Sequence, residues 1–285
     1  MEKKKKFAQL GDIWKRLRKN KLAVLGLIII VIIFLVAIFA NFIAPYSYDQ
    51  QDLLSCFQGP SAQHWFGTDE FGRDIFSRVV YGTRISLLIG FVAVAIAMVI
   101  GVLLGAFSGY YGATVDNVIM RLMDILLSIP QIILAIAIVA VLGNGLFNLM
   151  LAVGISSIPH YARIVRASVL SVKDQEFIEA AKAAGSSDLR IIFKHIIPNC
   201  LAPIIVQATL GVAMAILTAA GLSFVGLGIS PPTPELGSIL SSARSYIRDY
   251  AYMTMFPGLA IMITIFALNV LGDGLRDALD PKQKK

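Results

Sequence analysis

The chain has 285 residues, of which 57% are hydrophobic and 15% charged, and its mean hydropathy is +0.75. This composition is too apolar for an ordinary soluble domain and indicates an integral membrane protein. The net charge of +7 could suggest nucleic acid, but nine of the 25 Lys and Arg residues precede residue 22, directly against a long apolar run. Positive charge beside an apolar run is a membrane-topology signal, so we expect no nucleic-acid partner.

The basic segment 1–21 is followed by the first apolar run, residues 22–44, which carries no charge. At 1.5 Å per residue a helix over this run is about 34 Å long, enough to cross the ~30 Å hydrocarbon core. The alternative is a cleaved signal peptide, whose apolar region is about 7–15 residues long and ends in a small-residue cleavage site. This run is longer, and its end, FANFIAP, lacks that site. The sequence therefore predicts an uncleaved transmembrane helix.

A polar segment, residues 45–83, separates this helix from the second apolar run and is expected outside the membrane. It contains HWFGTDEFGRDIFSR, which is rich in glycine and acidic residues. The second span covers about residues 85–107. It includes three glycines that allow a neighbouring helix to approach closely, namely Gly90, Gly101 and Gly105.

The third span, about residues 118–142, contains Pro130 and two charged residues near its start. Arg121 and Asp124 are three positions apart, so they share one face of a helix and can form an ion pair. Ionisable groups inside a membrane often have a function, but these two lie within a turn or two of the end of the span. We therefore interpret them as a structural pair at the interface.

Three more spans complete a six-span topology with both termini inside: about residues 146–161, 201–222 and 253–271. The proline-rich stretch GLSFVGLGISPPTPELG between the last two cannot form a regular helix. Residues 84–272 then form a core of five spans, and 273–285 form an inner tail. This topology places all 25 Lys and Arg residues inside except Arg73, Arg78, Arg84, Arg244 and Arg248, as the positive-inside rule requires.

The cytoplasmic insert between the fourth and fifth spans contains FIEAAKAAGSSDLRIIFKHIIPN, residues 177–199. Good helix formers from Glu179 to Ala184 predict one short helix, and Gly185 predicts its end, because glycine tolerates the left-handed backbone found just past a helix C-terminus. Ser186, Ser187 and Asp188 are candidate N-caps for a second helix that runs from about residue 189 towards Pro198. We call this pair of helices the elbow.

Motifs for nucleotide, metal or catalytic chemistry are missing from the sequence. There is no P-loop and no Gly-Lys dipeptide, so the chain cannot bind a nucleotide in that way. The three histidines, His64, His160 and His195, are too far apart in the sequence to predict a metal site. The two cysteines, Cys56 and Cys200, fall on opposite sides of the membrane in this topology, so they do not indicate a redox pair. The chain is therefore predicted not to be an enzyme, to bind no cofactor or metal, and to need a separate polypeptide if it transports against a gradient.

The elbow resembles the EAA loop of binding-protein-dependent ABC importer permeases. Glu179-Ala180-Ala181, three residues, Gly185 and a helix that ends at Ile197-Pro198 match that pattern, although His195 and Ile197 replace its usual isoleucine and leucine. HWFGTDEFGRDIFSR, GLSFVGLGISPPTPELG and LGDGLRDALDP resemble the C-type subunit of the dipeptide/oligopeptide/nickel branch. The resemblance spans essentially the whole chain, and its motifs occur in the right order on the expected sides.

The resemblance implies an all-α, six-span type I importer permease fold in a bacterial or archaeal cytoplasmic membrane. It also implies a second permease subunit, either distinct or identical, two cytoplasmic ATPases that use ATP and Mg²⁺, and an extracytoplasmic solute-binding protein. The elbow, residues 176–198, would be the coupling loop that docks on an ATPase. The docking residues expected from this resemblance are Glu179, Ala180, Ala181, Lys182, Ala184 and Gly185.

Three questions stay open at this stage. Di- and oligopeptides are the first expectation for the substrate, and nickel or another small solute such as glutathione is the alternative. The segment 45–83 is expected either to contact the binding protein or to cover the outer mouth, and the proline-rich stretch either shapes the pathway or turns the chain. A secondary carrier would transport without ATP and leave the elbow without a purpose, whereas a membrane enzyme would need a reactive cluster that the sequence lacks.

Overall fold

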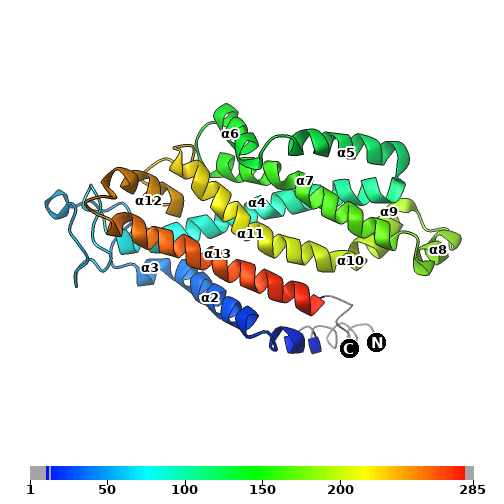
Figure 1. Ribbon diagram of the computed structural model, residues 1–285, viewed down its shortest axis with the longest axis horizontal. Coiled ribbons are helices and arrows are strands. Elements are labelled where there is room, and N and C mark those ends of the chain that lie inside the picture. The colour runs from blue at the N-terminus through cyan, green and yellow to red at the C-terminus, as the bar shows by residue number, and fades with distance from the viewer. Residues whose placement is uncertain (1–10, 13, 280–285) are drawn as a thin grey trace.

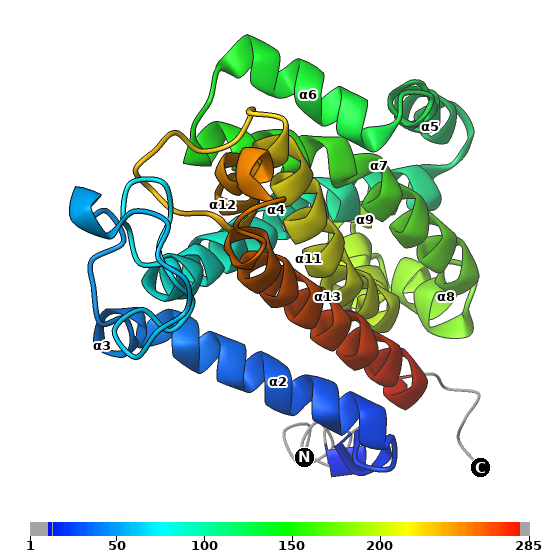
Figure 2. The same ribbon diagram turned by 60° about the vertical axis from the view of Figure 1, so that its left-hand side comes forward.

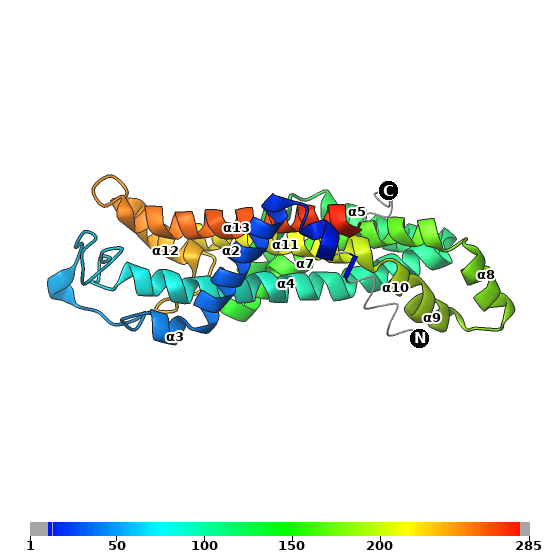
Figure 3. The same cartoon turned by 90° about the horizontal axis from the view of Figure 1, so that it is seen from below.

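The computed structural model describes residues 11–12 and 14–279. Regular structure in this part of the chain is helical, apart from an isolated β-bridge between Thr68 and Asp74. Four long helices run along the long axis of the molecule (Figure 1): α4 (Ile75–Tyr111), α7 (Leu146–Val172), α11 (Leu201–Phe224) and α13 (Tyr252–Leu279). The loop before α4 lies at one end of this bundle and the elbow at the other (Figure 3). We call these the loop end and the elbow end.

Short helices lie at the two ends. At the loop end are α3 (Ala40–Ile43), η1 (Leu53–Ser55), α12 (Leu236–Ala243) and η3 (Arg244–Tyr246). At the elbow end are α8 (Glu176–Ala183), α9 (Asp188–Ile191), η2 (Ile192–Ile196) and α10 (Ile197–Asn199).

Four helices in the described part of the chain are long and apolar enough to cross a membrane: α2 (Lys21–Ile38), α4, α11 and α13. The third expected span is two helices, α5 (Ala113–Leu127) and α6 (Gln131–Leu142), which meet at an angle of 88°. Counted together they make a fifth span. Pro130, at the junction, precedes the first residue of α6 and has no N–H to continue the ladder of α5.

The second membrane helix, α4, is much longer than the sequence predicted. It has 37 residues and would be about 56 Å long, so it projects beyond a ~30 Å hydrocarbon core. Its N-terminal turn consists of IFSR, the end of the motif that was expected in the outer loop. The expected loop 45–83 therefore ends at Asp74, which caps α4 through its side chain.

Small residues let α4 pack closely against two neighbours. A Cβ atom on Gly101 would lie 2.5 Å from the Cβ of Tyr161, and one on Gly105 would lie 2.4 Å from the carbonyl oxygen of Ala162, both on α7. Gly90 instead faces α11, where a Cβ would lie 2.8 Å from Ile216 Cγ1. The expectation that these glycines allow close helix contacts is confirmed, and it places α4 between α7 and α11.

Helix α2 packs along α13, as Figure 2 shows. A Cβ on Gly26 of α2 would lie 2.8 Å from the Ala267 carbonyl oxygen of α13, and one on Gly274 of α13 would lie 2.1 Å from the Cβ of Ala23. Leu17, Ala23 and Ala278 form a small buried cluster there. The start of α2 and the end of α13 are therefore neighbours, and both lie towards the elbow end (Figure 1).

Candidate functional site

The corner of the elbow is built by the backbone around Gly185. Gly185 has φ +75°, and two hydrogen bonds close the turn: its own N–H donates to the Lys182 carbonyl at 2.9 Å, and the Ser186 N–H donates to the Ala181 carbonyl at 3.1 Å. This pair of hydrogen bonds is a Schellman motif, which provides hydrogen-bond donors for the last carbonyl groups of α8. The corner expected at Gly185 is confirmed. A Cβ there would meet no atom within 4 Å, so only the backbone conformation favours glycine.

The root of the elbow is anchored by a buried apolar cluster. Ile178 of α8, Ile191, Ile192 and Ile196 are each 0% exposed, and they pack with Ala106 of α4 and with three valines of α7, Val165, Val169 and Val172. Burying one such side chain contributes about 1.5–3 kcal/mol. The elbow is therefore packed against the elbow ends of two long helices, α4 and α7, and is not a free loop.

Polar contacts add a second connection between the elbow and α4. The hydroxyl of Tyr110, in the last turn of α4, donates a 2.7 Å hydrogen bond to Asp188 Oδ1 at the start of α9. The Lys182 ammonium of α8 lies 5.6 Å from the centre of the same ring, in cation–π contact. One aromatic side chain therefore contacts both arms of the elbow.

The second arm of the elbow is helical, as expected, but it is not a regular α-helix. Its first residue follows Ser187, whose side chain makes no capping hydrogen bond. Residues 192–196 form a π-helical segment, in which the Ile197 N–H donates to the Ile192 carbonyl. Pro198 supplies no N–H and its ring crowds the preceding turn, and the wider π turn makes room for it.

The predicted docking residues differ in exposure. Five of them are exposed: Glu179, Ala180, Lys182, Ala184 and Gly185. Ala181 is half-buried and packs against the apolar cluster at the root.

Three exposed apolar side chains on the elbow were missed by the sequence analysis. Phe177 is 38% exposed, Leu189 is 56% exposed and Phe193 is 51% exposed. Large apolar residues that remain exposed in a polar segment are the signal that could have identified them.

Helix α5 is tied to α7 by two ion pairs. Arg166 of α7 places Nε 2.5 Å and Nη2 2.6 Å from the two oxygens of Asp116. Asp124 pairs with Arg163 of α7. The structure thus gives Asp124 a different partner from the expected Arg121, because α5 lies beside α7 and brings an arginine from 39 positions away.

The expected outer loop, residues 45–74, is folded and is organised by its own motif; we use the name cover for this folded segment. Asp74 Oδ2 accepts from both the N–H and the hydroxyl of Ser77 at 2.7 Å, and its other oxygen lies 2.9 Å from His64 Nδ1. Asp69 accepts the N–H groups of Phe71 and Arg73 at 2.9 Å each. Each carboxylate thus closes a turn of the loop, and the loop packs on the start of α4.

A buried carboxylate connects the cover's neighbour, α12, to α4. Glu235 is 0% exposed and accepts hydrogen bonds from Gly237 N–H at 3.0 Å, Ser238 N–H at 2.9 Å and the hydroxyl of Ser86 on α4 at 3.2 Å. It forms a capping box with Ser238. The proline-rich stretch before it therefore ends in a helix that is fixed to the bundle.

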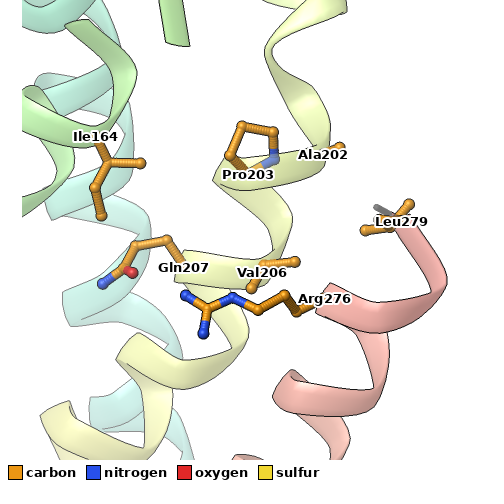
Figure 4. A pocket seen from close by; sticks show the side chains of 7 residues that line it. All are labelled: Ile164, Ala202, Pro203, Val206, Gln207, Arg276 and Leu279. Carbon is orange, nitrogen blue, oxygen red and sulfur yellow. The ribbon is translucent and has the colours of Figure 1, made fainter. Parts of the chain in front are cut away.

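Two cavities of similar size lie at opposite ends of the bundle. One, of about 400 Å³, opens between the elbow-end halves of α7, α11 and α13. Figure 4 shows its walls: apolar side chains together with Gln207 and the guanidinium of Arg276, which points towards Gln207. The other, of about 380 Å³, lies between the outer loop and the proline-rich stretch. Within the described residues no group of three His, Cys, Asp or Glu side chains could hold a metal ion.

Comparison with known proteins identifies the class of this helical membrane protein. Residues 101–285 match the family of binding-protein-dependent transport system inner membrane components, and residues 8–60 match the N-terminal transmembrane domain of oligopeptide transport permease C. The chain belongs to this family of ABC importer permeases. It is a multi-pass protein of the cytoplasmic membrane, and its subunit type is the transmembrane one rather than the catalytic one.

Within the family, the chain is a C-type permease of the dipeptide/oligopeptide branch. It is 53% identical to the dipeptide transport system permease protein DppC of Alkalihalophilus pseudofirmus over 96% of this chain and 90% of that protein. It is 46% identical to the di/tripeptide permease DppC of Pseudomonas aeruginosa, over 96% and 93% of the two chains. It is 49% identical to the glutathione transport system permease protein GsiD of Escherichia coli O157:H7, over 96% and 90%.

Solved structures support the fold. A chain of the inward-facing MetNI methionine ABC transporter aligns with a TM-score of 0.58 at 23% identity, over 71% of this chain and 96% of that one. A chain of an amino acid ABC transporter crystallised with histidines aligns with a TM-score of 0.54 at 16% identity, over 70% and 94%. Since nearly all of each shorter chain is covered, the shared part is a common permease fold.

Proposed function

We propose that this chain forms one half of the translocation pathway of an ATP-driven importer of dipeptides. A second, similar permease subunit provides the other half, and an extracytoplasmic solute-binding protein delivers the substrate. Two cytoplasmic ATPases bind ATP and Mg²⁺ and supply the energy. The observation that carries the proposal is the elbow: a rigid, exposed corner, anchored to α4 and α7, in a chain of this family that has no nucleotide motif of its own.

The proposed topology has six spans with both termini in the cytoplasm. The spans are α2, α4, the bent pair α5–α6, α7, α11 and α13. Helix α7 has 27 residues and is about 40 Å long, enough to cross the membrane, and its two internal arginines are paired with Asp116 and Asp124. Pairing removes the main cost of placing such charges near the lipid. The elbow is then cytoplasmic and the loop end is extracytoplasmic.

In this proposal the elbow transmits ATPase motion to the pathway. Glu179 and Ala180 present a polar and low-profile surface to the ATPase, and Phe177 and Leu189 add apolar contact area beside it. Closure of the ATPases moves the elbow, and the packed roots of α4 and α7 move with it because their side chains interlock. The spans then alternate between outward-facing and inward-facing arrangements.

Dipeptides are proposed as the substrate because relatives that carry that name match this chain at up to 53% identity over nearly its full length. The second candidate is glutathione, a modified tripeptide, because a permease with that name is 49% identical. Nickel remains an alternative that rests on branch membership alone. The three candidates are separated by an uptake measurement.

The test is transport by the complete complex reconstituted in proteoliposomes with its binding protein. We expect the complex to take up a labelled dipeptide only when ATP is present on the side of the membrane that carries the ATPases. This uptake should exceed the uptake of glutathione or nickel at equal concentration. Uptake that continues after ATP depletion would indicate a secondary carrier and would refute the proposal. The proposal would also be refuted if no ATPase co-purified with this chain in mild detergent.

Substitution of Gly185 tests the elbow directly. Valine is strained at φ +75°, whereas asparagine tolerates this left-handed conformation, so the two variants differ in backbone strain rather than in available space. We expect Gly185→Val to reduce ATP-driven uptake by roughly tenfold or more while membrane insertion is unchanged, a loss comparable to 1.4 kcal/mol or more in coupling. Gly185→Asn is the matched control and should retain most of the uptake. Equal uptake by both variants would contradict the role of the corner.

A further inference from the structure

Two motif stretches whose roles the sequence left open meet around the cavity at the loop end. This cavity measures about 380 Å³. The outer loop lines one side with Glu70, Phe71, Arg73 and the first turn of α4. The proline-rich stretch lines the other side with Ile229, Pro231, Pro232 and Thr233, and α12 adds Ser238 and Ser242. Since both motifs contribute walls, the cavity exists only because the cover and the proline-rich stretch fold against each other.

Two buried arginines in the cavity wall carry more hydrogen-bond donors than their neighbours accept. Arg73 and Arg78 are each 5% exposed, and both are directed at one carboxylate: their Nε atoms lie 2.7 Å and 3.6 Å from Asp69 Oδ2. Arg78 also donates from Nη1 to the Tyr48 carbonyl at 3.0 Å. The Nη2 atom of Arg73 lies 3.5 Å from Glu70 Oε1, which is longer than a good hydrogen bond. Donor capacity is therefore left over on the guanidinium groups.

Glu70 does not take up the remaining donors of these arginines. Its Oε2 atom is buried and has no hydrogen-bond partner among the described residues. Burial, reinforced by the nearby Asp69 carboxylate, raises the pKa of Glu70 above its ordinary value, although Arg73 and Arg78 act in the opposite direction. Burial disfavours the ionised form of this carboxyl because it removes water from the charge. Glu70 therefore leaves the remaining donors of the two arginines without a good hydrogen-bond partner.

The rest of the lining indicates what kind of anion fits. The Arg73 guanidinium lies 4.6 Å from the centre of the Phe71 ring, so one of its faces is covered and its edge remains for hydrogen bonding. Pro231 and Pro232 offer flat apolar walls without N–H groups, whereas Ser238 and Ser242 offer hydroxyls. A planar carboxylate matches an arginine edge, and a short chain with an amide matches the mixed walls.

We propose that this cavity is a subsite for the terminal carboxylate of a peptide, held by Arg73 and Arg78 at the outer mouth of the pathway. The inference rests on the proposed function, because it takes the loop end to be extracytoplasmic and peptides to be the substrates. It adds a site in the permease itself, in contact with the peptide after the binding protein releases it. The cover is then part of the substrate path.

Glu70 provides a variant that separates a binding site from a structural ion network. Asp69 and Arg73 close the turn of the loop, so replacing either can unfold the cover, whereas Glu70 makes no side-chain hydrogen bond to the described residues. Glu70→Gln removes a negative charge from the cavity and keeps the size of the side chain. A carboxylate ligand should therefore bind more tightly to this variant, which is an effect that partial unfolding cannot produce.

The experiment measures peptide binding to the permease–ATPase complex in nanodiscs of neutral lipid, without the binding protein, by saturation-transfer NMR. The probes are dialanine and dialanine amide, which differ only in the terminal carboxylate. We expect dialanine to bind several-fold more tightly than its amide. Glu70→Gln should strengthen dialanine binding by about threefold and leave the amide unchanged, and Thr233→Trp, which fills the cavity, should abolish the difference between the probes.

Each other outcome overturns the subsite. Equal binding of the two probes, or unchanged or weaker dialanine binding to Glu70→Gln, would show that the arginines serve only the fold of the cover. Loss of dialanine binding when anionic lipid is added to the discs would assign the cavity to a lipid headgroup instead. If ATP-driven dipeptide uptake occurs but binding does not depend on the terminal carboxylate, the subsite proposal is refuted and the importer proposal stands. Carboxylate-dependent binding without ATP-driven uptake would instead sink the proposed importer function.

Discussion

At the scale of single residues, Tyr110 shows how a membrane helix is connected to the elbow. Its hydroxyl binds Asp188 of the second arm and its ring contacts Lys182 of the first arm. The apolar cluster beneath fixes the root, but these polar contacts fix the angle between the arms and α4. The lysine that the sequence suggested for ATPase docking therefore already has a neighbour within the chain, although it is exposed.

Removing the Tyr110 hydroxyl should weaken coupling without disturbing the fold. Tyr110→Phe keeps the ring and the contact with Lys182 and loses only the bond to Asp188. Because hydrogen bonds to charged groups are worth about 1.5–3 kcal/mol when buried and less when exposed, we expect dipeptide uptake per ATP hydrolysed to fall by about two- to fivefold. The measurement is uptake and ATPase activity in the same proteoliposomes.

The adjacent Tyr111 supplies a matched control, since it lies at the same helix end and is 44% exposed. Tyr111→Phe should leave the ratio of uptake to ATP hydrolysis unchanged. Asp188→Asn should lower it as Tyr110→Phe does, and the double variant should show no further loss, because both changes remove one interaction. Additive losses would show that Tyr110 and Asp188 act independently.

Residues differ in how well their roles can be predicted from sequence, and locality is the reason. Gly185 could be predicted because the need for a left-handed backbone follows from its own neighbours along the chain. Tyr110 could not be predicted, because its partner Asp188 is 78 positions away. The pairing of Asp124 follows the same logic: helical spacing favoured Arg121, but packing of α5 on α7 supplied Arg163 instead.

At the scale of elements, the α4–α7 pair is the central packing unit that carries the elbow. Glycines at 101, 105 and 109 form one face of α4, and each brings its backbone against α7. A run of small residues at intervals of four lets two membrane helices approach until their backbones touch. The elbow packs against the elbow end of the α4–α7 pair, so the position of the elbow depends on the contact between these two helices.

Gly105→Val should separate the two helices. A Cβ at this position would lie 2.4 Å from the Ala162 carbonyl oxygen and 2.8 Å from Val165 Cβ, and the backbone of α7 cannot yield as a flexible side chain can. Overpacking of this kind typically costs about 1–3 kcal/mol, so we expect a melting temperature lower by several degrees and reduced uptake. Gly59→Val is the control, because no atom lies within 4 Å of its Cβ and its φ is not left-handed. Similar melting of both variants would contradict the close packing.

The sequence located most of the long helices, but it could not describe their shape. Apolar runs placed α2, α11 and α13 close to where they occur, because burial in lipid needs a long uncharged stretch. No pattern in the sequence indicated that α4 continues towards the loop end as far as Ile75, because its first turn is partly polar and reads as loop until the Asp74 cap is seen. Pro130 marked a disturbance in the third span, but only tertiary packing sets the angle of 88° between α5 and α6.

At the scale of the whole molecule, the two regions with functional character lie at opposite ends of one bundle. The cover and its arginine-lined cavity occupy the loop end, and the elbow occupies the other (Figure 3). α4 spans the distance between them, since Asp74 caps its first turn and Tyr110 contacts the elbow from its last. The arginine-lined cavity and the elbow are therefore in contact with opposite ends of a single helix.

This arrangement predicts which positions a membrane-impermeant maleimide reaches in whole cells. In a variant with Cys56→Ser and Cys200→Ala, Leu54→Cys should be labelled from outside, because Leu54 is 96% exposed on the cover. Ala183→Cys, exposed on the elbow, should be labelled only after the cells are permeabilised. The bilayer blocks the charged reagent, so the two labelling patterns report sidedness rather than local structure. Labelling of both positions in intact cells would refute the six-span topology, and labelling of Ala183→Cys alone would invert it and place the arginine-lined cavity in the cytoplasm.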